Sequence, residues 1–451
     1  MHILPFDFDY FHLTEPDQYS KRGRIFILPN VATGHEVILP VSQMQWFLDQ
    51  PDNVLNQHEV NKRFLAAEYT MLHPSNVTKG RLLNLVRRNL TRNIGTYAPA
   101  IADEAYHALK DTWGVGSFQW TEISLNNTML AIIGRLVGRV FAGLHFCRDQ
   151  GYLYHSTRFA QFCAVFQRNL TPQRTESRNH NNAPDFIDWA LADIKDPKER
   201  TPEMVTKRLA VVNFAAIQSS ATTVTNVLLD IAASPDSIAI QKELRLEAQQ
   251  ALNVSKANGG AWSTSTINKM VLIDSTLRES LRLWSFVSHG VTKTVLTLGG
   301  IRLPSGDHLP YGAHCGIASY GPQHDEDVYE NPYSFQPFRF CEGKQRKAIK
   351  APQADDEVVP GQSAPKSFVT TSEYMMGFNH GRHACPGRFF AAQQTKLLLP
   401  HIVLNYDIKP IPTRPQNRWL NNSSGPPMSA TLRIRRREVD GTGGRESEKD
   451  C

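Results

Sequence analysis

The chain has no long hydrophobic run, although it is 451 residues long. A helix that spans a bilayer needs about 20 consecutive apolar residues, and no stretch approaches that length. The opening segment, Met1 to Leu13, is rich in aromatic residues but includes Pro5, Asp7 and Asp9. It has neither a basic beginning nor a small-residue cleavage site, so we expect neither a membrane-spanning helix nor a secretory signal.

Blocks of basic residues and paired cysteines are also missing. The 49 lysine and arginine residues exceed the 43 acidic residues by only six, without long basic runs. This balance gives no indication of nucleic-acid binding and suits an acidic protein partner better. The cysteines are far apart, with no C-x-x-C pair, which argues against a disulfide framework and favours a reducing compartment. They are Cys147, Cys163, Cys315, Cys341, Cys385 and Cys451.

Among these, Cys385 lies in surroundings that favour a thiolate. Gly381 allows a tight bend ahead of it, and Pro386 with the apolar run 389–399 predicts a helix that begins directly after the cysteine. The N–H groups at a helix N-terminus lower the pKa of a thiol there. With no second ligand at zinc spacing, the thiolate is either a nucleophile or the single axial ligand of a haem iron. Two arginines add positive charge nearby, Arg382 and Arg388.

The pattern Phe-x-x-Gly-x-x-x-Cys-x-Gly, formed by Phe378, Gly381, Cys385 and Gly387, resembles the haem-binding loop of the cytochrome P450 family. The resemblance implies that Cys385 is the thiolate ligand of haem b (iron protoporphyrin IX), that Phe378 shields the sulfur and that His383 also lies at the cofactor. The alternative is a buried structural cysteine ahead of a helix.

Two further motifs support the resemblance. Glu279 and Arg282 stand three residues apart, and Arg339 lies in the sequence Pro337-Phe-Arg-Phe340. By spacing alone the first two form an ordinary surface ion pair. The family pattern instead places Glu279, Arg282 and Arg339 in one buried network that braces the haem loop, in which two guanidiniums share a carboxylate.

A long helix is expected from Thr201, the N-cap, and Pro202, its first residue, to about Ser234. Its centre, residues 215–220, resembles the oxygen-activating segment of the family, with Gln218 at the acid position and Ser219 at the threonine position; Ser220 follows. An amide cannot deliver a proton itself, so a chain of waters would have to do so. The alternative is a buried helix whose hydroxyls bond back to its own carbonyls.

The haem carboxylates need basic partners. The resemblance assigns this part to Arg92, on a helix predicted from Leu82 to Ala108, and to Lys293, which can act as a point charge. For Arg92 the alternative is a solvated basic surface.

Other segments have simpler patterns. Residues 24–28 and 36–40 read as paired strands, 41–48 and 269–284 as helices, and 121–141 as one helix. Residues 291–303 and 308–319 read as strands of a second sheet, and 406–410 with 430–435 as a closing hairpin.

The resemblance implies a mainly α-helical fold with a smaller β-rich lobe, the cytochrome P450 fold. We expect one haem-binding domain over residues 1–437 and a disordered tail over 438–451. Compared with the family, we expect this chain to lack the N-terminal membrane anchor usual in eukaryotic relatives, and to have a shortened region 164–185 where relatives have two helices over the active site.

The implied activity is that of a haem-thiolate monooxygenase, supplied with electrons by NADPH-cytochrome P450 reductase, that uses O2 to oxidise a small hydrophobic secondary metabolite. The sequences of residues 380–391 and 213–217 most resemble those of filamentous-fungal enzymes of secondary metabolism, many of which oxidise terpenoids. Alternatives are an indole alkaloid or polyketide substrate, or a haem-binding protein with impaired turnover. The family works at the cytosolic face of the endoplasmic reticulum, so this chain is expected to be soluble or peripherally associated with the membrane.

Overall fold

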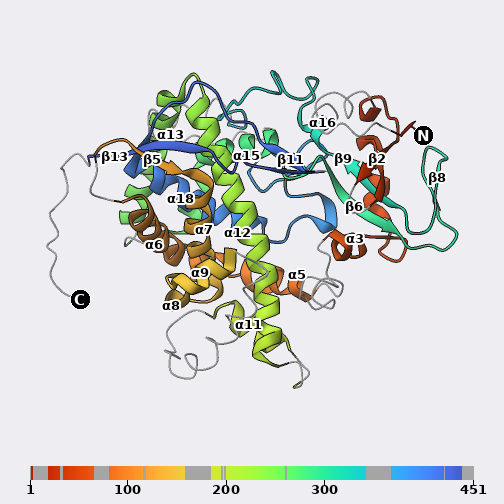
Figure 1. Ribbon diagram of the computed structural model, residues 1–451, viewed down its shortest axis with the longest axis horizontal. Coiled ribbons are helices and arrows are strands. Elements are labelled where there is room, and N and C mark those ends of the chain that lie inside the picture. The colour runs from red at the N-terminus through yellow and green to blue at the C-terminus, as the bar shows by residue number, and fades with distance from the viewer. Residues whose placement is uncertain are drawn as a thin grey trace.

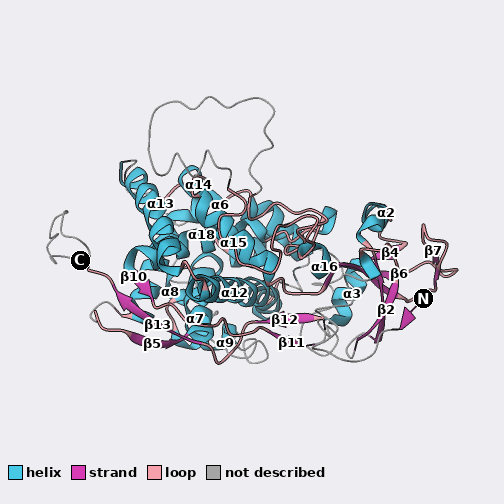
Figure 2. Ribbon diagram, turned by 90° about the horizontal axis from the view of Figure 1, so that it is seen from above, coloured by secondary structure: helices cyan, strands magenta, loops and turns pink. Residues whose placement is uncertain are grey.

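The computed structural model describes residues 2–3, 19–30, 34–64, 81–114, 118–157, 184–194, 197, 200–257, 259, 262–341, 367–420 and 422–438. The helices gather in one large lobe, and the largest sheet forms a smaller lobe next to the N-terminus (Figures 1 and 2). The expected mainly α-helical fold with a smaller β-rich lobe is therefore confirmed.

The helices of the described residues are α2 (Met44–Asp49), α3 (Gln57–Phe64), α5 (Arg81–Leu85), α6 (Ile94–Trp113), α7 (Leu125–Phe141), α8 (Leu144–Cys147), α9 (Gln150–Thr157), α11 (Phe186–Asp193), α12 (Pro202–Ala233), α13 (Ser237–Ala257), α14 (Thr264–Asn268), α15 (Val271–Leu283), α16 (Tyr320–Gln323) and α18 (Arg388–Asn405). Two short 3₁₀ helices, η1 (Val41–Gln43) and η4 (Gly381–His383), and a π-helix, η2 (Val86–Thr91), complete them.

The main sheet has the strand order β1 (His2–Ile3), β2 (Phe26–Asn30), β3 (Gly34–Leu39), β9 (His314–Ala318), β6 (His289–Val295) and β4 (Leu55–Asn56). Smaller sheets are β10 (Tyr406–Ile408), β13 (Thr431–Arg436) and β5 (Thr121–Ser124); β11 (Arg418–Leu420) with β12 (Ser423–Gly425); and β7 (Ile301–Arg302) with β8 (His308–Leu309).

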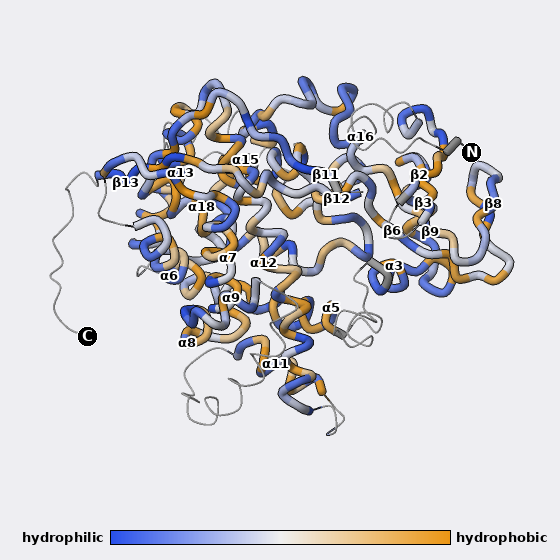
Figure 3. Tube along the Cα trace, viewed as in Figure 1, coloured by the Kyte–Doolittle hydropathy of each residue, from blue (hydrophilic) through white to orange (hydrophobic). Residues whose placement is uncertain are grey.

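The helix α12 runs through the middle of the helical lobe (Figure 1). Thr201 is its N-cap and accepts a hydrogen bond from the N–H of Met204 at 3.2 Å, and Pro202 is its first residue, as predicted. The largest cluster of buried apolar side chains lies among α6, α7, α12, α15 and α18. In Figure 3, hydrophobic and hydrophilic residues are interspersed along these helices. The central helix is thus fixed by burial on several sides.

Several predictions of local structure were wrong. The predicted helix from Leu82 to Ala108 is interrupted by η2 and a turn, since the side chains of Thr91 and Asn93 bond to the backbone carbonyls of Val86 and Asn89. Residues 121–124 are not helical: they form β5, which pairs with β13.

The strand pairings also differ from those predicted. The expected pair β2–β3 is present, but β6 and β9 join this same sheet instead of forming a second one, because β9 pairs in parallel with β3. Within the same two predicted segments, β7 and β8 do pair as a separate two-stranded sheet. Residues 406–408 and 431–436 do pair, as β10 and β13, and β5 adds a third strand. Pairing between distant strands is decided by packing, which a local pattern does not encode.

None of the helices in the described ranges combines the length and apolar content that crossing a membrane requires. The shortened region predicted at 164–185 lies outside the described residues apart from Pro184 and Asp185, and the predicted tail at 438–451 lies outside them apart from Glu438.

One buried carboxylate fixes the start of α15, the helix that carries Glu279 and Arg282. Glu247 on α13 accepts hydrogen bonds from the N–H groups of Leu272 and Ile273 at 2.8 and 2.9 Å. Burial raises its pKa to about 7, although these backbone hydrogen bonds act to lower it.

A pH dependence of stability follows from Glu247. Its carboxyl binds a proton more tightly in the folded chain, so its stabilising contribution is fully present below the unfolded pKa of 4.5 and is lost as the pH rises through about 7. We expect the thermal midpoint of the wild type to fall relative to that of Glu247→Gln across this window. Calorimetry at several pH values checks it, and a constant difference between the two proteins would contradict it.

Candidate functional site

The loop ahead of Cys385 is bent by a glycine that no other residue could replace without strain. Gly381 has a φ of +70°, and a Cβ added there would lie 2.6 Å from the side chain of Leu48. The N–H of Cys385 donates to the carbonyl of Phe378 at 2.8 Å. The ring of Phe378 packs edge-on against that of Phe368, with 5.1 Å between the ring centroids. The loop is thus closed on itself and anchored to the core by Phe378.

The helix after the cysteine begins two residues later than predicted. α18 starts at Arg388 with Gly387 as its N-cap, and Pro386 lies in the preceding turn. A Cβ on Gly387 would come within 3.9 Å of the sulfur of Cys385, so the small residue keeps that side of the thiol open. The described residues contain no cluster of three or more histidine, cysteine or acidic side chains able to hold a metal.

The prediction of a lowered thiol pKa was wrong for the chain by itself. Burial raises the pKa of Cys385, while hydrogen bonds from the N–H groups of Gly387 and Arg388 and the charge of Arg388 lower it. The helix N-terminus acts in the predicted direction, but the loss of hydration outweighs it. Arg382 has another partner: its guanidinium donates to the carboxylate of Asp52 at 2.9 Å.

His383 shares that carboxylate. Its Nε2 lies 3.2 Å from Oδ1 of Asp52, and its ring meets that of His58 on α3 edge to face at 6.2 Å. Nδ1 of His58 is buried and has no hydrogen-bond partner among the described residues. Burial lowers the pKa of His383.

The structure brings Glu279, Arg282 and Arg339 together. Arg282 donates to both carboxylate oxygens of Glu279 at 2.8 and 2.9 Å, and Arg339 donates to Oε1 at 3.0 Å. Both Glu279 and Arg282 are fully buried, which excludes the alternative of a surface ion pair. Remaining guanidinium donors bind carbonyls, those of Arg282 reaching Gln323 and Pro332 at 2.7 Å each.

The network reaches the cysteine loop through Gln323. The carbonyl of Gln323 accepts from Arg282, and its side-chain oxygen accepts from the N–H of Met376 at 2.9 Å. A Cβ on Gly377 would lie 2.6 Å from the side chain of Leu281, so α15 also packs directly against the loop. The ion network therefore fixes the residues that lead into Phe378.

On α12, the structure separates the three predicted residues. Gln218 and Ser219 are partly exposed on one face together with Val211, Ala215 and Thr222, at spacings of three and four residues, whereas Ser220 is buried. The Ser219 hydroxyl donates to the carbonyl of Ala215 at 2.6 Å, which is the back-bonding considered as the alternative.

Ser220 turns to the opposite side, toward α18. Its hydroxyl accepts a hydrogen bond from the side-chain amide of Gln394. Because Gln394 lies only about two turns beyond the start of α18, this contact places the centre of α12 roughly 10 Å along that helix from the thiol. The buried side of α12 thus packs on the helix that follows the cysteine.

The two basic residues predicted for the haem carboxylates have different surroundings. Lys293 is fully buried in β6; its ammonium donates to the carbonyl of Phe47 at 2.6 Å, and burial lowers its pKa to about 8. Arg92 is exposed, directly after η2. The nearby Arg87 instead contacts the cysteine loop, since it donates to the carbonyl of Arg382 at 3.0 Å.

Sequence reasoning missed several of these residues. Arg87 and Thr91 reach the loop from η2, the latter by donating to the carbonyl of Pro386 at 3.2 Å. Asp52 binds the loop through the guanidinium of Arg382, and Gln323 binds it through the N–H of Met376. Gln394, on α18 itself, joins that helix to Ser220 of α12. Single polar residues carry no local signal, and η2, an element of a kind often found at functional sites, is seen only in the structure.

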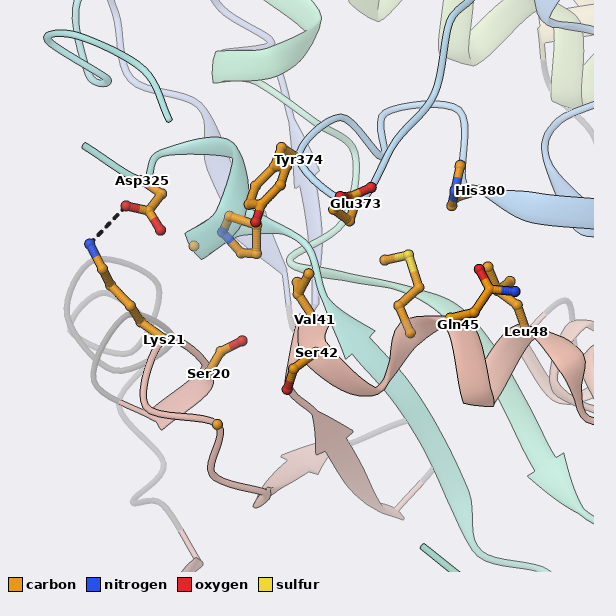
Figure 4. A pocket seen from close by; sticks show the side chains of 14 residues that line it. Ser20, Lys21, Val41, Ser42, Gln45, Leu48, Asp325, Glu373, Tyr374 and His380 are labelled. Atoms are coloured by element: carbon orange, nitrogen blue, oxygen red, sulfur yellow. Dashed lines mark hydrogen bonds and ion pairs between the residues drawn. The ribbon is translucent and has the colours of Figure 1, made fainter. Parts of the chain in front are cut away.

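A separate pocket of about 530 Å³ lies beside the loop (Figure 4). Lys21 and Asp325 form an ion pair of 2.8 Å at one end, and Leu48 and His380 lie toward the other. Cys385 does not line it, so this pocket is not the candidate site.

Comparisons with known proteins agree with this geometry. Residues 153–432 match the family model described as Cytochrome P450. The chain is 29% identical to cytochrome P450 monooxygenase gloP of Glarea lozoyensis, over 93% of this chain and 85% of that protein, and 27% identical to polB of Polytolypa hystricis, over 94% and 87%. Among solved structures, a retinoic acid bound cyanobacterial CYP120A1 is similar in fold, with a TM-score of 0.66 and 16% identity over 95% of each chain.

Removal of the buried carboxylate tests the network. Glu279→Ala leaves the guanidinium of Arg282 buried without its counter-charge, so we expect a loss of about 3–5 kcal/mol in the free energy of unfolding. The control is Lys207→Ala, which breaks the exposed Lys207–Glu203 pair on α12 and should cost under about 1 kcal/mol. Denaturant unfolding measures both, and equal costs for the two variants would contradict the prediction.

Proposed function

The chain belongs to the cytochrome P450 family of monooxygenases, and from that premise we propose that it uses O2 and electrons from NADPH-cytochrome P450 reductase to oxidise a hydrophobic secondary metabolite, with a terpenoid as the expected substrate. The single observation that carries the proposal is the thiol of Cys385, held just ahead of a helix in a loop that a buried ion network braces. Such a thiolate favours cleavage of the O–O bond.

The residues present fit haem b. The thiol is half-buried and has a small residue, Gly387, at its side. The buried ammonium of Lys293 has three donors but only the carbonyl of Phe47 as an acceptor among the described side chains and backbone. A buried cation and the orphaned Nδ1 of His58 are the surroundings in which a carboxylate of the cofactor is stabilised.

We therefore assign Cys385 as the iron ligand, Phe378 as the shield of the sulfur, and Lys293 and His383 as partners of the haem carboxylates. Arg92, exposed at the end of η2, is a third partner of the haem carboxylates. Gly381 and Gly387 give the cysteine loop its shape. When bound, the haem iron activates dioxygen so that one oxygen atom enters the substrate and the other leaves as water.

Residues of α12 deliver the protons that this reaction consumes. Gln218 and Ser219 lie on the partly exposed face, and an amide can hold a water although it cannot release a proton. Ser219, which now donates to Ala215, must turn its hydroxyl outward to donate to an oxygen at the site. Ser220 supports this pair indirectly through its contact with Gln394.

The apolar side chains on the same face, Val211, Phe214 and Ala215, suit a hydrophobic substrate. Both fungal relatives compared above are named as cytochrome P450 monooxygenases, which supports a similar oxidation here. From the family resemblance we also place the reaction at the cytosolic face of the endoplasmic reticulum, in one haem domain over residues 1–437. The second candidate is a haem-binding protein with impaired turnover, favoured by Gln218 at the acid position.

Ligation by Cys385 has a spectroscopic test. The reduced, CO-treated protein should show the red-shifted Soret band of thiolate ligation, and Cys385→Ala should abolish it because no other thiol lies in this loop. Cys341→Ala, which removes a thiol outside the loop, is the control and should keep the band. A Cys385→Ala variant that retained the band would refute the assignment.

Proton delivery is tested by the coupling of NADPH oxidation to product. Ser219→Ala should leave substrate binding and haem reduction intact but divert electrons to peroxide, because the last hydrogen-bond donor is lost. Gln218→Glu should be tolerated or faster, since it restores a group that exchanges protons in the same shape. The measurement is product formed per NADPH oxidised, with peroxide released. Unchanged coupling in Ser219→Ala would show that the proton path runs elsewhere.

A further inference from the structure

Three non-glycine residues in the described ranges have a positive φ: Val291 at +53°, Asn331 at +49° and Asn379 at +62°. Asparagine enters the left-handed region at modest cost because its short polar side chain can bond locally, whereas a β-branched valine very rarely does. Val291 is fully buried in β6, at the point where the pairing of β6 with β9 is irregular, between Gly290 and Lys293. Such strain persists only where the surroundings hold it.

The group that holds Val291 belongs to the cysteine loop. The side-chain oxygen of Asn379 accepts a hydrogen bond from the N–H of Val291 at 2.9 Å and a second from the N–H of His380, also at 2.9 Å. The N–H of Asn379 itself donates to the carbonyl of Met376 at 2.7 Å, which closes a tight turn. Two left-handed residues from distant parts of the chain are thus joined directly.

The space around this contact leaves little freedom. A Cβ on Gly290, the residue before Val291, would lie 3.7 Å from the side-chain oxygen of Asn379, and a Cβ on Gly316 of β9 would lie 3.2 Å from the carbonyl of Gly290. The strand therefore approaches both its neighbour and the loop closely at this bulge.

The contact lies one residue from the hydrogen bond that holds the cysteine. Phe378, which precedes Asn379, accepts the hydrogen bond from the N–H of Cys385 at 2.8 Å. Release of Asn379 from Val291 would free the 378–379 peptide to turn and carry that acceptor away from the cysteine. On the strand side, Val291 lies two residues before Lys293, so the bulge also decides which way the buried ammonium faces.

We propose that Asn379 and Val291 form a clamp that positions the Cys385 thiolate as an iron ligand, and that the strain at Val291 is maintained by its hydrogen bond to Asn379. Both are positioning residues, because they act through the carbonyl of Phe378. The ligand part of this proposal rests on the proposed haem-thiolate function, whereas the coupling between positions 291 and 379 does not.

The coupling is tested by a double-mutant cycle. Asn379→Gly removes the acceptor and tolerates a positive φ, and Val291→Gly removes the strain. We expect Asn379→Gly to lower the thermal midpoint in the wild-type background and to lower it less in the Val291→Gly background, where the backbone needs no clamp. Equal shifts in the two backgrounds would overturn the clamp.

The ligand part is tested by the spectrum of the reduced, CO-treated protein. Asn379→Gly should shift much of the thiolate band to the form with a protonated or detached thiol, at unchanged haem content and below its thermal midpoint. Asn379→Asp keeps the side-chain acceptor and should retain the band. A full thiolate band in folded Asn379→Gly would overturn the positioning role. If the wild type itself gave no thiolate band, the proposed function would fail while the result of the cycle stood.

Discussion

The fully buried carboxylate of Glu279 is the constraint on which the cysteine loop depends. Its two oxygens receive the guanidiniums of Arg282 and Arg339, and each guanidinium places its remaining donors on backbone carbonyls. Burying these charges costs free energy unless every donor and acceptor is used. Since the carbonyls lie in irregular segments, the same requirement fixes those segments.

That rigidity is transmitted to the thiol by backbone contacts. The carbonyl of Gln323 accepts a hydrogen bond from Arg282, and its side-chain oxygen accepts one from the N–H of Met376. Met376 lies two residues before Phe378, whose carbonyl accepts the hydrogen bond from the N–H of Cys385. From the opposite side, Arg87 and Thr91 of the π-helix η2 bind the carbonyls of Arg382 and Pro386. The loop is therefore held from several elements, each through a main-chain atom rather than through the sulfur.

The electrostatics of the thiol follow from the same burial. Burial raises the pKa of Cys385 despite the N–H groups of Gly387 and Arg388. A bound metal ion would reverse this balance, because a metal-coordinated thiol is deprotonated. The N-terminus of α18 and the charge of Arg388 would then stabilise a thiolate that they do not produce by themselves.

The sequence by itself determined the parts whose chemistry is local. Cys385 ahead of a helix, the bend at Gly381, the cap at Thr201 and the three-residue spacing of Glu279 and Arg282 all depend on neighbours along the chain, and the structure has each of them. Tertiary structure alone decided that β9 joins β3 and that Ser220 turns toward Gln394. It also decided the pKa of the thiol, because burial and hydrogen bonds between distant segments are fixed only when the chain has packed, and no local pattern of residues encodes them.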